Sequence, residues 1–174
     1  MRTITTVKTV YSFDELGEDA QEKAVENLYD LNIDYDWWEF VFEDASEVGL
    51  KLTSFDIDRG RSCKGEFIED ALFTADRIIE THGSTCDTYK TAAAFLKERD
   101  EAVNNAPRDE NGDFEDEDEL DRQLDDIEND FLTDLLADYL SMLIQEYEYK
   151  TSREAIIETI EINNYEFDED GNLA

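Results

Sequence analysis

Proline, glycine, cysteine and histidine are all scarce in this sequence of 174 residues. One proline and seven glycines exclude a collagen-like or low-complexity chain. The two cysteines are too few for a disulfide framework and favour a reducing compartment. No apolar run reaches the roughly 18 residues of a membrane span, and the first residues lack the apolar core of a signal peptide. These absences predict a cytoplasmic protein without a membrane partner.

Basic residues are scarce as well, since 15 Lys and Arg face 48 Asp and Glu, for a formal charge of −33. Free nucleic acid is therefore a poor partner, because its phosphates would repel the chain. An apolar content of 40% and an aromatic content of 11% are high enough to exclude disorder. We expect a folded, strongly acidic protein.

The negative charge is concentrated in the last third of the chain. The formal charge is −10 for residues 1–60, −2 for residues 61–108 and −21 for residues 109–174. This asymmetry favours one strongly negative face over a uniform adaptation for solubility. The basic cluster Arg59, Arg61 and Lys64 is small.

Hydrophobic periodicity predicts an α+β fold, helix-dominant, with five to six helices packed on a small antiparallel sheet. Strands are expected at residues 2–11, 50–57 and 63–67, the last two forming a hairpin, with a short strand at 165–167. Helices are expected at residues 14–29, 35–48, 68–82, 85–103, 115–149 and 155–162. Residues 1–174 would form a single domain with a flexible acidic loop at 104–115.

Two of the expected helices have assignable inner faces. The spacing in residues 115–149 places these side chains inward: Leu120, Leu124, Ile127, Phe131, Leu135, Tyr139 and Leu143. In residues 85–103 the expected inner positions are Tyr89, Ala92, Ala93, Leu96 and Arg99.

The acidic residues of the 115–149 helix form two rows. Between Asp109 and Asp138 there are 15 acids and one base, Arg122. Each like-charge pair four residues apart costs roughly 0.2–0.5 kcal/mol, so ordinary surface design would not leave this repulsion uncompensated. The first row steps by four residues and the second lies beside it; together they comprise Asp118, Asp121, Asp125, Asp126, Glu128, Asp130, Asp134 and Asp138.

Such rows resemble a nucleic-acid backbone. A four-residue helical step advances about 6 Å, while phosphates recur every 3.4 Å along each DNA strand, or about 6.8 Å for two steps. One row is too sparse, so further acids must contribute; the candidates are Glu26, Asp30, Asp34, Asp36, Glu39, Glu43, Asp44 and Glu47. The expected partner is a cationic nucleic-acid-binding protein. The alternative is a solvated face with no partner.

Metal and catalytic motifs are weak. Asp109, Asn111 and Asp113 match positions 1, 3 and 5 of a calcium loop, but Phe114 and Leu120 replace its required glycine and glutamate. Cys63, His82 and Cys86 lack a fourth zinc ligand and are expected to be structural. No GxSxG, Walker A or HExxH motif is present. We expect no metal, no cofactor and no enzymatic activity.

Several stretches are similar to a family of small acidic phage and prophage proteins, over nearly the whole chain. They are Tyr11-Ser-Phe-Asp-Glu-Leu, Cys63-Lys-Gly-Glu-Phe, His82-Gly-Ser-Thr-Cys-Asp-Thr-Tyr and Tyr165-Glu-Phe-Asp-Glu-Asp-Gly. Some members of that family are described as antitoxins of toxin–antitoxin systems. The resemblance implies a mobile-element origin, an action in the host cell cytosol and no catalytic residues. In composition, the chain also resembles phage DNA-mimic proteins that inhibit restriction enzymes or CRISPR effectors.

These features give two hypotheses of function. The first is a phage-type inhibitor that presents a DNA-like acidic surface to a cationic host defence protein. The second is an antitoxin-like or regulatory binding module that uses an apolar groove or the neutral middle third, including residues 59–67. A homodimer is compatible with either hypothesis.

Overall fold

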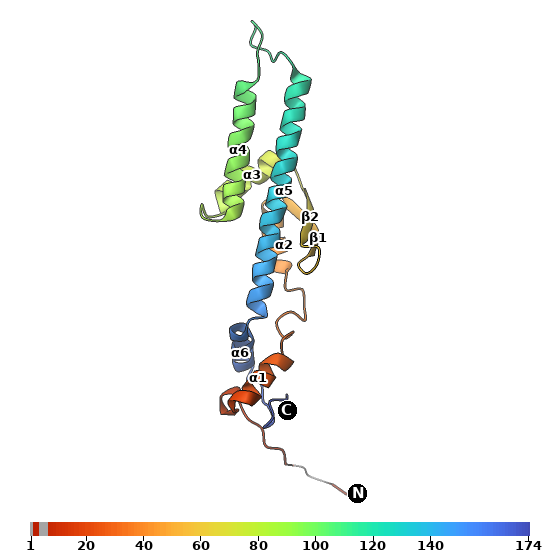
Figure 1. Cartoon of the computed structure of the whole chain (residues 1–174), viewed down its shortest axis with the longest axis vertical. Helices are drawn as coiled ribbons and strands as arrows, with labels where there is room; N and C mark the ends of the chain where they lie inside the picture. Colours follow the sequence, from red (N-terminus) through yellow and green to blue (C-terminus); the bar gives the residue numbers. More distant parts are fainter. Residues whose placement is uncertain (1, 4–6) are drawn as a thin grey trace. The chain divides into compact units, whose positions relative to one another are not determined.

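A computed structural model describes residues 2–3 and 7–174 of the chain. Its elements are packed as a helix-dominant α+β fold, which confirms the predicted class (Figure 1). In chain order they are a 3-10 turn η1 (Phe13–Glu15), α1 (Glu18–Asn27), α2 (Glu39–Glu47), β1 (Leu50–Asp56), β2 (Ser62–Phe67), α3 (Ala71–Thr81), α4 (Asp87–Asn105), α5 (Glu117–Lys150) and α6 (Arg153–Ile162).

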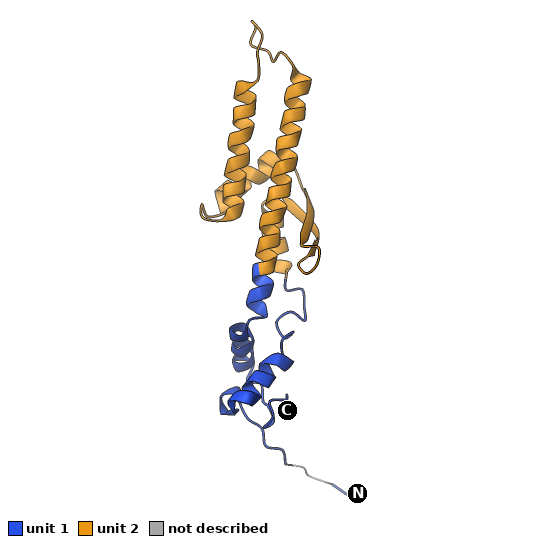
Figure 2. Cartoon of the chain, viewed as in Figure 1, with its two compact units in different colours: residues 1–37, 145–174 blue, residues 38–144 orange. Residues whose placement is uncertain are grey.

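The chain divides into two compact units (Figure 2). Unit 1 comprises residues 1–37 and 145–174, and unit 2 comprises residues 38–144. Helix α5 contributes its last residues to unit 1 and the rest to unit 2. The expectation of a single domain over residues 1–174 stays a prediction.

Unit 1 is built on the pairing of α1 with α6. Its buried side chains come from η1, α1, α6 and the C-terminal segment, and they are Phe13, Leu16, Ala24, Val25, Ile156, Ile160 and Phe167. The rings of Phe13 and Phe167 meet edge to face with centroids 6.3 Å apart. Ser152 begins α6, and its hydroxyl accepts a hydrogen bond from the Ala155 amide. The helix predicted at residues 155–162 is therefore confirmed, with its start two residues earlier.

The predicted helix over residues 14–29 is wrong at its start, because two short elements replace it. Ser12 and Glu15 close a capping box around η1, with the Ser12 amide donating to Glu15 Oε2 over 2.9 Å. Leu16 then adopts an extended conformation, and Gly17 is the N-cap of α1. The capping box therefore caps the single turn η1, and the acids at residues 14–19 belong to the N-termini of η1 and α1.

The predicted strand over residues 2–11 is also wrong in its described part. Only Tyr11 pairs, in an isolated antiparallel bridge with Phe167. Residues 7–10 have no regular structure, and Val7 is 91% exposed. Apolar alternation forms a strand only where a partner strand lies beside it, and Ile4 lies outside the described residues. Phe167, in the short strand predicted at 165–167, pairs through isolated bridges with Tyr11 and Leu173.

Unit 2 contains the predicted hairpin. Strands β1 and β2 pair antiparallel from Leu50 opposite Phe67 to Asp56 opposite Ser62, with a bulge at Thr53. The Asp56 carboxylate accepts hydrogen bonds from the amides of Asp58 and Gly60, which fixes the turn. The hairpin packs on α5, where Phe67 stacks on Phe131 with centroids 5.7 Å apart.

Helix α5 supplies the main core face of unit 2. All seven predicted inner residues are buried, Leu124 only partly, and Leu135, Tyr139 and Leu143 are 0% exposed. Phe131 stacks on Phe95 of α4 with centroids 4.3 Å apart. The helices predicted at 85–103 and 115–149 match α4 and α5 within two residues at each end. In the part of the chain that the structure describes, none of these helices is both long and apolar enough to cross a membrane.

Two predicted helices are shorter than expected. Residues 35–38 precede α2 rather than belong to it, and the Trp37 ring packs against Tyr147 with centroids 5.5 Å apart. Helix α3 starts at Ala71 because Asp70 is its N-cap, accepting a hydrogen bond from the Phe73 amide over 2.8 Å. The predicted start at residue 68 overlooked this cap.

Candidate acidic interaction surface

The acidic residues predicted to bind a partner all lie on α5 in unit 2. Six of the eight have exposed side chains: Asp118, Asp121, Asp125, Asp126, Asp130 and Asp134. Glu128 and Asp138 are half-buried. We call these eight residues the α5 acidic surface. Six of the eight residues are therefore accessible to a partner, and two are accessible only in part.

The two rows of the α5 acidic surface lie on opposite flanks of the buried stripe. At about 100° per residue, Asp118, Asp121, Asp125 and Glu128 project to one side of Ile127 and Phe131. Asp126, Asp130, Asp134 and Asp138 project to the other side and wind along the helix with the stripe. The negative charge consequently wraps the exposed arc of α5, and the expectation that the second row lies beside the first on one face is wrong, because the buried stripe lies between them.

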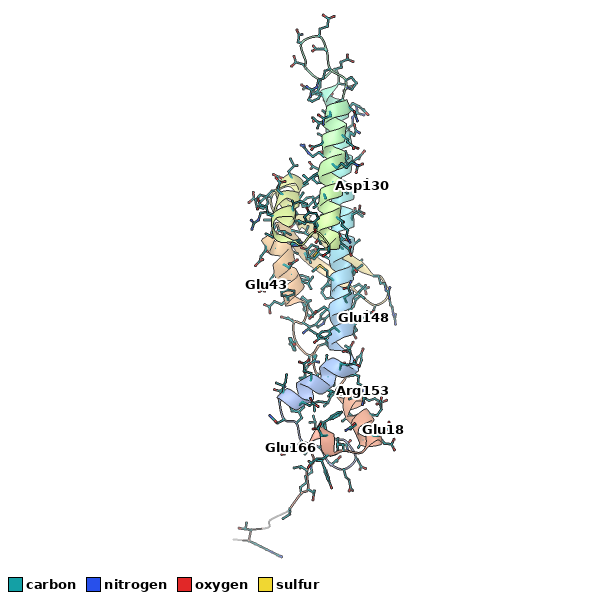
Figure 3. The ribbon with its side chains drawn as sticks, turned by 90° about the vertical axis from the view of Figure 1, so that its left-hand side faces the viewer. Glu18, Glu43, Asp130, Glu148, Arg153 and Glu166 are labelled. Atoms are coloured by element: carbon teal, nitrogen blue, oxygen red, sulfur yellow. The ribbon has the colours of Figure 1, made fainter. Side chains whose placement is uncertain are left out.

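The second row faces α4. Asp138 accepts a hydrogen bond from the Thr91 hydroxyl of α4, with Oγ1 and Oδ2 2.7 Å apart. Asp130 and Asp134 line a hollow of about 270 Å³ together with Lys90, Thr91 and Glu98 of α4, and its floor is apolar: Ala94, Phe95, Ile127 and Phe131. Asp130, labelled in Figure 3, lies about midway along the paired part of the two helices. Helix α4 therefore forms the second wall of this part of the surface.

A second hollow of about 420 Å³ lies near the loop end of the α4–α5 pair. Its charged residues are all acidic: Glu98 and Glu101 from α4, Asp116 and Glu119 from α5 and the turn before it. Sequence reasoning missed the α4 acids. Glu98 and Glu101 lie three residues apart on one face of α4, but their place beside α5 follows from the packing of the two helices, which the local pattern does not give.

Very little of this charge is neutralised within the protein. Within residues 2–3 and 7–174, none of the eight carboxylates of the α5 acidic surface takes part in an ion pair. Arg122, the base of this segment, pairs with Glu119 over 3.0 Å. Lys90 of α4 pairs with Asp87 over 2.6 Å. Within the described residues, the carboxylates of this set are therefore not neutralised by an ion pair.

Asp138 differs from the exposed members of the set. Partial burial raises the pKa of its carboxyl above the ordinary value, and the charges of Asp87 and Asp134 raise it further. The hydrogen bond from Thr91 and the ammonium of Lys90 oppose this rise in pKa. A side chain held in this way positions α4 against α5 and is less free to meet a partner.

The acids proposed as neighbours divide between the units. Glu26, Asp30, Asp34 and Asp36 belong to unit 1, while Glu39, Glu43 and Glu47 are exposed on α2 in unit 2, where Figure 3 labels Glu43. Asp44 of α2 points inward: its Oδ2 accepts a hydrogen bond from the Tyr139 hydroxyl over 2.9 Å. Asp44 is therefore not part of an outward-facing row.

A polar network in unit 2 includes the one histidine of the chain. His82 Nδ1 lies 2.7 Å from the Thr88 hydroxyl, and its Nε2 lies 3.7 Å from Asp44 Oδ1. Burial and the Asp44 charge keep the pKa of Tyr139 above its ordinary value. The sequence of hydroxyl, imidazole and carboxylate resembles a catalytic triad, but Thr88 is only 3% exposed. The network joins α2, α4 and α5 to the end of α3.

The weaker candidates are dispersed. Cys63 lies half-buried on β2, where burial raises its thiol pKa, and Cys86 is the exposed N-cap of α4. Among the described residues, no group of three or more His, Cys, Asp or Glu side chains is arranged to hold a metal ion. In the calcium-like loop, the Asp109 carboxylate accepts hydrogen bonds from the Asn111 and Asp113 amides, which lowers its pKa.

The basic cluster belongs to the hairpin. Arg59 and Arg61 are exposed in its turn and Lys64 is exposed on β2, so these cations project from the hairpin into solvent. Arg59 lies 3.9 Å from the neighbouring Asp58.

Comparison with known proteins adds no constraint: no family model, curated protein or solved structure matches this chain.

Proposed function

We propose that this protein is a phage-type inhibitor of a host nucleic-acid-binding defence protein of the restriction or CRISPR class. Its α5 acidic surface would occupy the cationic groove in which the host protein binds DNA. Inhibition is then competitive and needs no catalytic group or cofactor. Attraction between an acidic and a cationic surface also speeds association, because it steers the two proteins together.

The observation that supports this proposal most strongly is the uncompensated charge of α5 and of the loop before it. Residues 109–138 contain 15 acids and one base, and no carboxylate of the α5 acidic surface is ion-paired within residues 2–3 and 7–174. Such repulsion weakens the fold, so a purpose outside the fold is the simplest reason for its presence. A cationic partner would remove the repulsion on binding.

The spacing of the carboxylates supports the proposal that the α5 acidic surface resembles a DNA backbone. Four-residue steps on α5 place charges about 6 Å apart, close to the 6.8 Å of two phosphate steps. Glu98 and Asp116 add charges across the α4–α5 hollow, whereas Glu101 and Glu119, which also line it, are paired with Lys97 and Arg122. The density of anions therefore comes from two adjacent helices.

The test is inhibition of DNA cleavage by purified restriction endonucleases and CRISPR effectors, compared between the wild type and two variants of equal charge change. The first variant carries Asp118→Lys, Asp121→Lys, Asp126→Lys and Asp130→Lys on α5. The control carries Glu148→Lys, Glu158→Lys, Glu169→Lys and Asp170→Lys, which are exposed acids of unit 1 outside both sets of candidate surface acids. We expect the wild type to inhibit at least one enzyme, and the control to retain that inhibition.

The first variant should lose inhibition, and excess DNA duplex or a tenfold rise in ionic strength should relieve inhibition by the wild type. Equal loss in both variants, or wild-type inhibition that is insensitive to salt, would contradict the proposal. Partners outside the panel can be captured from a bacterial lysate at low salt and eluted with a salt gradient.

An antitoxin-like or regulatory binding module is the second candidate, favoured by an apolar surface in unit 2. Ile68 and Phe73 are 52% and 40% exposed. They line a hollow of about 380 Å³ whose other lining residues are Ser46, Glu47, Gly49, Glu69 and Arg77, so its apolar part is confined to these two side chains. Exposed apolar groups in a concave site are typical of protein contacts. Loss of partner binding in Phe73→Ala, with no effect of the α5 reversals, would favour this function.

A further inference from the structure

Unit 1 contains a hollow of about 530 Å³, separate from the α5 acidic surface. It lies between residues 10–15, which include η1, and the end of α6 with the turn that follows it. Its walls are aromatic and acidic. The half-buried Tyr11 and Tyr165 provide the rings, and Asp14, Glu15, Glu161 and Glu166 provide the carboxylates; the Phe13 ring is buried against Phe167.

The charge of this hollow has one sign. Its lining contains four acids and no lysine, arginine or histidine. Glu161 and Glu166 are exposed, and Figure 3 labels Glu166 in this part of unit 1. Aromatic faces and carboxylates together attract ammonium and guanidinium groups, the rings through their quadrupole and the carboxylates through their charge. The hollow is therefore complementary to the side chains of lysine and arginine.

A free backbone edge borders the same hollow. Tyr11 exchanges both backbone hydrogen bonds with Phe167, at 2.8 and 2.9 Å. This bridge is isolated, and the residue before it belongs to no strand, so its amide and carbonyl are not committed to a ladder. That residue, Val10, lines the hollow and is 37% exposed. Within the described residues, its backbone makes no hydrogen bond.

We propose that this hollow binds an extended, lysine- or arginine-rich peptide segment of a protein partner. The segment would pair with the free edge at Val10 and place its cationic side chains among Tyr165, Glu161 and Glu166. Strand addition supplies affinity through backbone hydrogen bonds, and the acidic and aromatic walls supply the preference for basic side chains. This inference is independent of the α5 acidic surface and does not rest on the proposed function.

The probe is a capped eight-residue peptide of alternating arginine and valine, titrated into the ¹⁵N-labelled full-length protein. Two comparison peptides isolate the two parts of the proposal. One alternates glutamate and valine, and the other is the arginine peptide with alternate backbone nitrogens methylated, so that it cannot pair as a strand. We expect saturable NMR shifts at residues 10–15 and 160–166 with the arginine peptide. Binding should be at least about tenfold weaker with either comparison peptide.

Substitutions in the protein test the same two contributions to binding as the comparison peptides do. Val10→Pro removes the free amide donor without removing any hydrogen bond of the fold, and should weaken binding about tenfold. Glu161→Lys with Glu166→Lys should abolish binding. The matched control, Glu154→Lys with Glu158→Lys, changes two exposed acids of α6 outside the hollow and should bind like the wild type.

Three outcomes would overturn the proposal. The first is the absence of saturable shifts at residues 10–15 and 160–166. The second is equal weakening by both double reversals, which would mean unspecific attraction to an acidic protein. The third is full binding of the methylated peptide, which would exclude strand addition even if Val10→Pro failed to fold.

Discussion

Thr91 of α4 donates its hydroxyl hydrogen to the Asp138 carboxylate of α5 over 2.7 Å. This bond links α4 to α5 near the start of α4, away from the loop that joins the two helices. It lies at the end of the acidic row Asp126, Asp130, Asp134 and Asp138. Along the row, the side chains pass from exposed to half-buried. The residues at the exposed end are available to a partner, whereas Asp138 is committed to the fold.

Replacing Asp138 with asparagine should leave stability at neutral pH unchanged or raise it, by at most about 0.5 kcal/mol because the site is partly exposed and screened. Burial raises the pKa of this carboxyl in the folded state, so its ionised form opposes folding at pH values above that raised pKa. The amide oxygen of asparagine can still accept the Thr91 hydrogen bond. Urea unfolding at pH 7 and pH 4 measures the effect.

The gain from Asp138→Asn should shrink as the pH falls through the folded pKa, because the native carboxyl is then protonated and uncharged as well. Thr91→Val is the control, since it removes the hydrogen bond and retains the charge. It should destabilise the protein by about 1 kcal/mol. A clear loss of stability in Asp138→Asn at pH 7 would mean that the charge itself holds α4 and α5 together.

Phe131→Ala should destabilise unit 2 by about 3–5 kcal/mol. The Phe131 ring is 3% exposed and stacks between Phe95 and Phe67, so its removal leaves a cavity where α4, α5 and β2 meet. Phe40→Ala is the matched control, because the Phe40 side chain is 68% exposed on α2. The control should change the free energy of unfolding by less than about 0.5 kcal/mol. Similar urea midpoints for the two variants would contradict this account of the core.

Much of the fold could be predicted from local patterns. The seven apolar positions of α5 repeat with helical spacing over more than 20 residues, and such a long signal determines both the helix and its buried face. The hairpin was predictable because two β-favouring runs flank a turn with Arg59 and Gly60. In both cases the local preference agrees with the packing.

Features that depend on distant residues could not be predicted in this way. In α4, the three consecutive residues Ala92, Ala93 and Ala94 do not show which face of the helix is buried. The large buried side chain is Phe95, whereas Leu96 was expected. The inward orientation of Asp44 depends on Tyr139, which is 95 residues away in the sequence. The contribution of the α4 acids to the candidate surface follows from the packing of α4 on α5, which single-residue patterns do not encode.

Two turns share one local geometry, and their glycines provide a second pair of variants. Asp109 to Asp113 and Asp168 to Asn172 each close with a glycine amide that donates to the first aspartate carbonyl over 3.1 Å. Gly112 and Gly171 have φ values of +88° and +81°. A Cβ at Gly171 would collide with the Ala20 backbone of α1, while a Cβ at Gly112 would meet open space.

Gly112→Ala should therefore cost about 1 kcal/mol from backbone strain alone. Gly171→Ala should cost clearly more, because the turn must also move away from α1. Thermal unfolding of the two variants measures the difference. Equal costs would show that the contact between the second turn and α1 yields without penalty.

Self-repulsion of the acidic surface predicts that added salt stabilises the protein. At a formal charge of −33, the unpaired carboxylates of α5 repel one another more in the folded state than in the more expanded unfolded chain, and salt screens that repulsion. The melting temperature should therefore rise between 10 mM and 500 mM NaCl.

A variant with Asp118→Asn, Asp121→Asn, Asp126→Asn and Asp130→Asn should melt higher at low salt, by several degrees if each relieved pair contributes about 0.2–0.5 kcal/mol. Its dependence on salt should be shallower than that of the wild type. Four neutralising changes at exposed acids of unit 1, Glu148→Gln, Glu158→Gln, Glu169→Gln and Asp170→Asn, provide the control for net charge. If both variants gave the same salt dependence, the repulsion would be a property of the whole chain. The α5 acidic surface would then carry no more uncompensated negative charge than the rest of the protein.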